Sequence, residues 1–146
     1  MNFWSESVLV TSILSWFAAQ VIKVFFSLIQ NKRFDFRRLV GSGGMPSSHA
    51  SFVTSLATAV GLEKGFSGTE FAICAVFALV VMYDAAGVRR AAGQQARILN
   101  KLMEEWEKSD FSHSDKHLKE LLGHTPKEVF VGALLGITIA LLRHML

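Results

Sequence analysis

The chain has 146 residues, with 15 Lys and Arg against 12 Asp and Glu, so its formal net charge is only +3. Hydrophobic residues make up 51% and charged residues 18%, which excludes a disordered chain. So small a cationic excess cannot coat a polyanion, and we expect no nucleic acid as partner. The length allows one domain, residues 1–146, and the single cysteine, Cys74, excludes an intramolecular disulfide.

The hydrophobic residues are concentrated in four blocks, at about residues 8–29, 49–62, 71–88 and 129–142. The first is long enough to cross a bilayer as a helix, and the third and fourth approach that length. The second is shorter and richer in Ser, Thr and Ala, which is typical of a half-length or protein-buried helix. We therefore predict an all-α fold, a polytopic membrane bundle with three to four membrane helices. The alternative, a soluble helical domain, would have too little polar surface.

An amphipathic helix is predicted after the third block, because apolar residues recur there at helical spacings and the opposite face is charged. The apolar residues are Val88, Ala92, Leu99, Leu102 and Trp106, opposite Arg90, Arg97, Lys101, Glu104 and Glu105. This helix would be a cytosolic extension that packs on the domain or lies at the membrane surface. Residues 108–116 are expected to form a loop, and residues 118–122 a short helix.

Positive charges follow the first and third blocks, at residues 32–38 and 89–101, whereas the connection 63–70 carries only Lys64 as a base. The positive-inside rule places the two cationic segments in the cytoplasm. If the second block crosses fully, both termini lie outside. We expect an integral, multi-pass protein of the bacterial cytoplasmic membrane.

Ionisable residues inside apolar blocks are costly and usually face the protein interior. Gln20, Lys23, Ser27 and Gln30 are spaced so that they form a stripe along one helical face. Lys23 either snorkels to the cytosolic interface or points into a polar site between helices. Asp84, near the end of the third block, is either a counter-charge to Lys23 or an arginine, or a member of that site.

Two segments look suited to binding an anion, and the first is residues 41–49, GSGGMPSSH, just before the second block. Its glycines let the backbone approach a ligand closely. Ser47 or Ser48 can cap the following helix, whose positive end faces the loop. His49 would supply a proton donor or acceptor there. The alternative is an ordinary Gly-Ser turn with a surface histidine.

The second segment is residues 123–128, GHTPKE. Thr125 and Glu128 form a capping-box pattern, with Pro126 at the first helical position. The cap does not account for His124, which sits just outside the helix start and can attack an anion docked on the helix end. Glu128 either orients the His124 ring through a hydrogen bond or serves only as a cap.

Two histidines at two helix starts, with cations nearby, suit phosphoryl transfer. One histidine would attack phosphorus to form a phosphohistidine, while the other protonates the leaving oxygen and cations hold the remaining oxygens. The scheme requires no cofactor and no metal. The sequence contains neither a carboxylate cluster for magnesium nor an HExxH zinc motif.

These motifs resemble a known family. Residues 43–49 (GGMPSSH), 83–90 (YDAAGVRR), 123–129 (GHTPKEV) and 132–136 (GALLG) are similar, in order and combination, to the divergent branch of the PAP2 family. This group is described as acid phosphatase/vanadium-dependent haloperoxidase-related membrane proteins. The resemblance implies a PAP2-like helical bundle with its site near one membrane face, commonly acting on lipid phosphates.

The resemblance also implies residue roles. His49 corresponds to the general acid of the middle motif, and His124 to the nucleophile, with Glu128 as the acid four residues later. Lys23 fits the lysine of the first motif. The expected phosphate-binding residues are Lys23 with Arg37 or Arg38, the loop residues Gly43, Gly44, Ser47 and Ser48, and Arg89 or Arg90, with Asp84 as a charge partner.

The leading hypothesis is a membrane-embedded phosphatase, facing the cytosol, for a lipid phosphate or pyrophosphate such as phosphatidate, phosphatidylglycerophosphate or a polyprenyl pyrophosphate. The alternative is an inactive membrane protein that binds a phosphorylated lipid or a protein partner, because Ser48 and Glu128 stand where the PAP2 pattern has Gly and Asp. A small transporter using Lys23 and Asp84 is a third, less favoured hypothesis. The small residues in 132–136 would pack within one chain or between subunits of a homo-oligomer.

Overall fold

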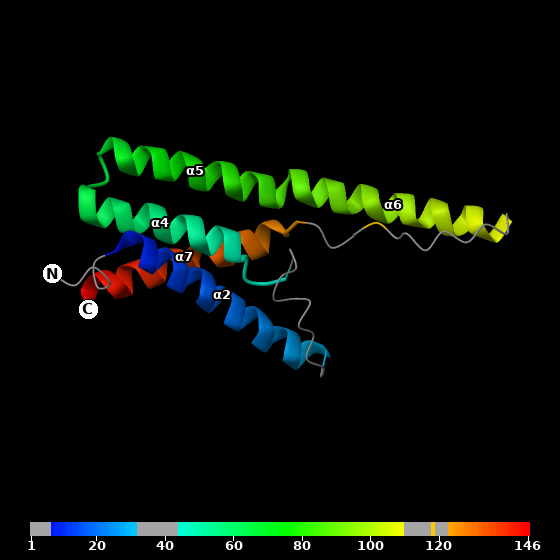
Figure 1. Ribbon diagram of the computed structural model, residues 1–146, viewed down its shortest axis with the longest axis horizontal. Coiled ribbons are helices and arrows are strands. Elements are labelled where there is room, and N and C mark those ends of the chain that lie inside the picture. Colours follow the sequence, from blue (N-terminus) through cyan, green and yellow to red (C-terminus); the bar gives the residue numbers. More distant parts are fainter. Residues whose placement is uncertain (1–6, 32–43, 110–117, 119–122) are drawn as a thin grey trace.

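Figure 1 shows a bundle of long helices, from a computed structural model that describes residues 7–31, 44–109, 118 and 123–146. All regular structure in these ranges is α-helical, which confirms the predicted fold class. The helices are α2 (Val8–Asn31), α4 (Ser48–Lys64), α5 (Thr69–Ala86), α6 (Val88–Ser109) and α7 (Pro126–Met145).

Three stretches are long and apolar enough to cross a membrane, namely Val8–Ile29, Thr69–Trp106 and Pro126–Met145. The remaining helix, α4, has 17 residues, which corresponds to about 25 Å at the α-helical rise. It packs against α2, α5 and α7 and lies between α5 and α2 in Figure 1. The chain is therefore an integral membrane protein. Of the two alternatives for its second apolar block, a half-length or a protein-buried helix, the packing of α4 on three other helices favours the second.

The helices alternate in direction along the bundle. We call the end where α5 stops and where α4 and α7 begin the histidine end, and the end where α2 begins and α7 stops the terminal end (Figure 1). Val8, at the start of α2, and Arg143, near the end of α7, line one hollow at the terminal end, and α6 extends away from the histidine end (Figure 1). This arrangement agrees with the expectation that both ends of the chain lie on one side of the membrane. Which side faces the cytosol stays a prediction.

Small residues let α7 approach α4 closely. A side chain at Gly136 would collide with the Thr54 hydroxyl and the Ser51 carbonyl, and one at Gly132 would collide with the Ser47 backbone. The Thr54 hydroxyl also donates to the Ala133 carbonyl across the interface (3.1 Å). The small face of α7 is thus used within one chain, not between subunits.

Polar side chains join α2 to α4. The Ser15 and Ser51 hydroxyls lie 2.6 Å apart, and the Ser51 hydroxyl donates to the Ser15 carbonyl (3.2 Å). Gln20, Lys23 and Ser27 are buried, which confirms that the predicted polar stripe faces the protein. The side chain of Gln30, the last member of that stripe, lies outside the described residues.

The predicted amphipathic helix is α6, which is separated from α5 at Gly87 and continues to Ser109. Residues 108 and 109 are therefore helical and not part of a loop. The Asn100 side chain pairs with the backbone of Leu118, donating to its carbonyl (2.9 Å) and accepting from its N–H (2.8 Å). Leu118 is not helical, and the rest of the predicted loop and short helix lies outside the described residues.

Candidate active site

Two histidines meet at the histidine end of the bundle. His49 lies in the first turn of α4, and His124 comes just before α7. Their ring centroids are 6.0 Å apart with the rings at 72°, an edge-to-face arrangement. The sequence placed both at helix starts, and the structure brings those two starts together.

His124 is deeply buried, with 2% of its surface exposed. Neither ring nitrogen has a hydrogen-bond partner in the described part of the chain. Burial, reinforced by the charges of Lys23, His49 and Arg89, lowers the pKa of His124 to about 4. The imidazole is therefore neutral at physiological pH and keeps a lone pair for attack on an electrophile.

The backbone around His124 fixes its position. Its N–H donates to the Ala85 carbonyl near the end of α5 (2.9 Å). The preceding Gly123 has φ 88°, and a side chain there would collide with the backbone of Arg89 and Arg90. Only glycine combines this positive φ with such close approach. The turn before α7 therefore packs directly against the junction between α5 and α6.

Lys23 points into the same end of the bundle from α2. Its side chain is 3% exposed, so it does not snorkel to water. Its aliphatic stem runs beside Gly44, where an added Cβ would lie 3.6 Å from the Lys23 Cγ. The Lys23 ammonium interacts electrostatically with Glu128 and with His124. The structure therefore supports the second interpretation of Lys23, a cation directed into a polar site.

Glu128 closes the capping box of α7 and does not orient His124. Its Oε2 accepts from the Thr125 N–H (2.9 Å), and its own N–H donates to the Thr125 hydroxyl (3.3 Å). The expected hydrogen bond from the His124 ring to this carboxylate is absent from the described residues. The Glu128 carboxylate accepts from the Thr125 N–H and not from the His124 ring, because Thr125 and Glu128 belong to the same turn of the cap.

The loop before α4 is tied to α7. Ser47 is the residue that caps α4, accepting from the Ala50 N–H (3.3 Å), while Ser48 is the first helical residue and is buried. The Ser47 N–H donates to the Glu128 carbonyl (3.0 Å), so this particular N–H is not free to bind an anion. Gly44, at φ 86°, lies against Lys23. The other candidates, Gly43, Arg37 and Arg38, lie outside the described residues.

Arg89 and Asp84 form an ion pair at the mouth of the site, with 2.6 Å between the Arg89 Nε and the Asp84 Oδ2. This identifies an arginine, and not Lys23, as the partner of Asp84. Both members of the pair line a cavity of about 20 Å³, together with His49, Val81, Ala85 and His124. Such a volume holds about one water. Both candidate arginines are exposed on α6, and Arg89 is the one that lines this cavity.

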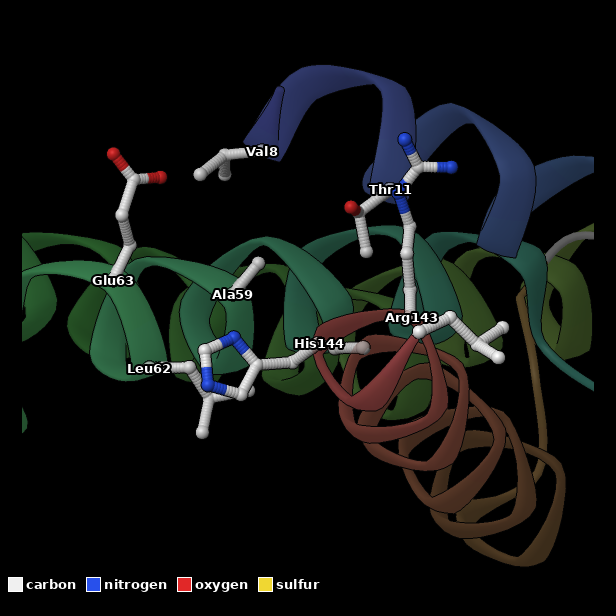
Figure 2. Close-up of a pocket in the computed structure, with 9 residues that line it drawn as sticks. Val8, Thr11, Ala59, Leu62, Glu63, Arg143 and His144 are labelled. Atoms are coloured by element: carbon white, nitrogen blue, oxygen red, sulfur yellow. The ribbon is translucent and has the colours of Figure 1, made fainter. Parts of the chain in front are cut away.

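A second, larger hollow lies at the terminal end (Figure 2). Its volume is about 590 Å³, and Thr11, Glu63, Arg143 and His144 supply its polar groups. Sequence reasoning did not single out this hollow, although Arg143 and His144 stand in the last turn of α7, where cations offset the helix dipole. No group of three or more His, Cys, Asp and Glu residues in the described ranges is placed to hold a metal ion.

The fold and this end of the bundle define a small polytopic helical membrane protein in which a buried histidine, His124, lies beside an exposed one, His49. The family model for the divergent PAP2 family matches residues 4–139, and the chain belongs to that family, as its motifs predicted. The chain is 44% identical over 151 residues to a Bacillus subtilis (strain 168) protein named "Uncharacterized membrane protein YuiD", covering 97% of this chain and 96% of the relative. No solved structure matches the chain significantly.

Proposed function

We propose that the protein is a membrane phosphatase that hydrolyses a lipid phosphate or pyrophosphate through a phosphohistidine on His124. The observation that carries this proposal is a buried imidazole with no hydrogen-bond partner in the described residues, 6.0 Å from a second histidine and within reach of Lys23 and Arg89 charges. A neutral, unpartnered histidine among cations suits attack on a phosphoryl group. Family membership and the membrane helices support the lipid character of the substrate.

In the first step, one ring nitrogen of His124 bonds to phosphorus and the bond from phosphorus to the leaving oxygen breaks. His49, in its protonated form, donates a proton to that oxygen. Lys23 and Arg89 offset the charge on the remaining phosphoryl oxygens. In the second step, water attacks phosphorus, His49 accepts its proton, and inorganic phosphate leaves with the P–N bond broken.

The cavity must open for this chemistry, because about 20 Å³ is too small for a phosphoryl group. The Arg89–Asp84 pair is half exposed, and such pairs contribute only about 0–1 kcal/mol. A phosphoryl group can therefore replace Asp84 as the partner of Arg89. This exchange would bring the arginine onto the substrate as the site fills.

One observation favours a second candidate, a non-enzymatic protein that binds a phosphorylated lipid. The carboxylate of Glu128 is engaged in the cap, so among the described residues His124 has no carboxylate partner of the kind that usually orients a catalytic histidine. The same cations would still hold a phosphate. Saturable binding of lipid phosphates without turnover, across all three substrate classes named above, would support this candidate over the phosphatase.

The test of the phosphatase is trapping of the intermediate. Purified full-length protein in detergent with EDTA would be mixed with a lipid phosphate labelled on phosphorus and quenched in alkali, in which phosphohistidine survives. We expect label on the peptide that carries His124, and no label in a His124→Ala variant. Hydrolysis without labelled His124, or label on His49 instead, would overturn the assignment of the nucleophile. We further propose a cytosol-facing site in the bacterial cytoplasmic membrane, in line with the placement of the cations.

A further inference from the structure

In the part of the chain that the structure describes, one face of the central helix α4 is only partly covered by the neighbouring helices. Around α4, α2 makes contact at Ser51, α7 at Thr54 and α5 at Ala50. At 3.6 residues per turn these contacts leave one side of the helix open. The residues on that side are His49, Phe52, Leu56 and Val60, of which His49 is exposed and the others are half-buried. We call this face the α4 strip.

The α4 strip is bordered by α2 and α5. These two helices do not approach each other closely in the described part of the chain, and Figure 1 shows α4 lying between them. On the α5 side, the border includes Val81 and Asp84, which also line the small cavity beside His49 and His124. The strip and the cavity therefore meet at His49.

The chemistry changes along the strip. At its His49 end stand the two histidines and Arg89. Phe52 and Leu56 follow one and two turns further along the same face, in the part of α4 that runs beside the membrane-crossing helices. His49 and Leu56 are about 10 Å apart along the helix axis. A ligand that matches this sequence of groups has an anionic head and a hydrocarbon chain.

We infer that the α4 strip holds the hydrocarbon chain of the phosphorylated lipid, which enters sideways from the bilayer between α2 and α5 and brings its phosphate to His49 and His124. This inference rests on the proposed function and adds to it where the hydrocarbon chain of the lipid binds. The strip contacts only the part of the hydrocarbon chain nearest the phosphate. We therefore expect kcat/KM to rise with the length of the hydrocarbon chain until that chain covers Leu56, and then to level off.

Another apolar groove serves as the comparison. It lies between α5 and α7, has a volume of about 670 Å³, and includes Leu79, Met82 and Phe130. The packing of Ala85 against Ala50 and Val129, and the hydrogen bond from His124 to Ala85, stand between this groove and the cavity. A hydrocarbon chain bound in the α5–α7 groove would be separated from the two histidines by these contacts.

The first experiment is photo-crosslinking and needs no turnover. The probe is a single-chain alkyl phosphonate with a diazirine a few carbons from phosphorus, used on the full-length protein in detergent. We expect crosslinks to Phe52 or Leu56 that excess inorganic phosphate reduces. Crosslinks confined to the α5–α7 groove, or spread over all lipid-facing helices and insensitive to phosphate, would overturn the inference.

The second experiment compares Leu56→Trp with the matched variant Leu134→Trp, which alters an exposed position on α7. We expect Leu56→Trp to lower kcat/KM at least about tenfold for a long-chain lipid phosphate, with less than a twofold change for a short, water-soluble phosphate ester. Leu134→Trp should change neither. An equal effect of Leu56→Trp on both substrates, or none on either, contradicts the strip.

The two proposals fail in different ways. Wild-type protein that hydrolyses neither substrate would overturn the phosphatase, while the crosslinking pattern still decides whether the α4 strip binds the chain. Hydrolysis of the soluble ester with no chain-length preference would leave the phosphatase standing and overturn the strip. Phe52→Ala, which removes bulk from the same face, supplies a second variant if Leu56→Trp fails to fold.

Discussion

The two ends of the bundle carry similar side chains in very different surroundings. At the histidine end, His124 is buried beside Arg89 around a cavity of about 20 Å³. At the terminal end, His144 is exposed, and it lines a hollow of about 590 Å³ with Arg143 and Glu63 (Figure 2). By volume alone, the hollow at the terminal end would be the stronger candidate for a ligand site.

The two ends differ in desolvation and in the convergence of charged and polar groups more than in volume. Water reaches His144 and screens its charged neighbours, whereas the protein around His124 removes water and lowers its pKa. Four elements, α2, α4, the α5–α6 junction and the start of α7, direct groups toward the histidine end. The predictions below test whether chemistry is confined to that end.

The largest effect is expected from removing the proposed nucleophile. His124→Ala should lower kcat for lipid phosphate hydrolysis at least about 1,000-fold, because we assign the covalent intermediate to the His124 ring and a methyl side chain cannot form the P–N bond. His144→Ala, the matched change at the terminal end, should alter kcat less than about twofold. Phosphate release in detergent with EDTA measures both. Equal release by His124→Ala and wild-type protein would show that His124 is not the nucleophile.

The next effect concerns the buried cation. Lys23→Met keeps the length and burial of the side chain but removes its charge, so we expect kcat/KM to fall about 100-fold through lost stabilisation of the phosphoryl oxygens. Lys64→Met, at the exposed terminal end of α4, makes the same chemical change away from the histidines and should leave kcat/KM within about twofold. A similar loss in both variants would point to a general effect on the protein.

At the histidine end, the features that depend on short-range sequence rules could be predicted from the sequence. The capping box at Thr125 and Glu128 predicts the start of α7, and the helical spacing of Gln20, Lys23 and Ser27 predicts the buried face of α2. These features depend on residues within a few turns of one another. The positions of His49 and His124 at two helix starts, and then the family motifs, pointed to both as candidate site residues.

Other features depend on how distant segments pack, and sequence spacing does not reveal them. The Asp84–Arg89 pair spans five residues across the break at Gly87, which no regular helical spacing predicts. The contact of Asn100 with Leu118 and the open face of α4 likewise arise only when the helices are assembled.

The buried imidazole should also make stability depend on pH. The His124 side chain binds a proton near pH 6.5 when unfolded but only near pH 4 when folded, so unfolding takes up a proton between these values and acid favours the unfolded state. Stability is fully present above about pH 6.5 and falls as the pH is lowered. Between pH 7.5 and 5 the loss is about 2 kcal/mol, or about 4–8 °C in Tm.

Thermal unfolding in detergent at several pH values measures this dependence. His124→Gln should remove that part of the slope, because the amide does not titrate. His144→Gln should leave the slope as in the wild type. If His124→Gln keeps the full wild-type slope, His124 is not the buried neutral group that the structure shows.

The smallest effect is expected at the ion pair that covers the cavity. Asp84→Asn removes the carboxylate that holds Arg89 at 2.6 Å, so the guanidinium is released and one negative charge leaves the cavity wall. We expect inorganic phosphate to bind about three- to fivefold more tightly, in keeping with the modest strength of an exposed pair. Glu63→Gln makes the equivalent change at the terminal end, and there phosphate affinity should not change. Inhibition by phosphate or direct calorimetry gives the affinity. Weaker binding in Asp84→Asn would mean that Asp84 positions Arg89 for the phosphate, and the terminal-end control separates that outcome from a change in overall charge.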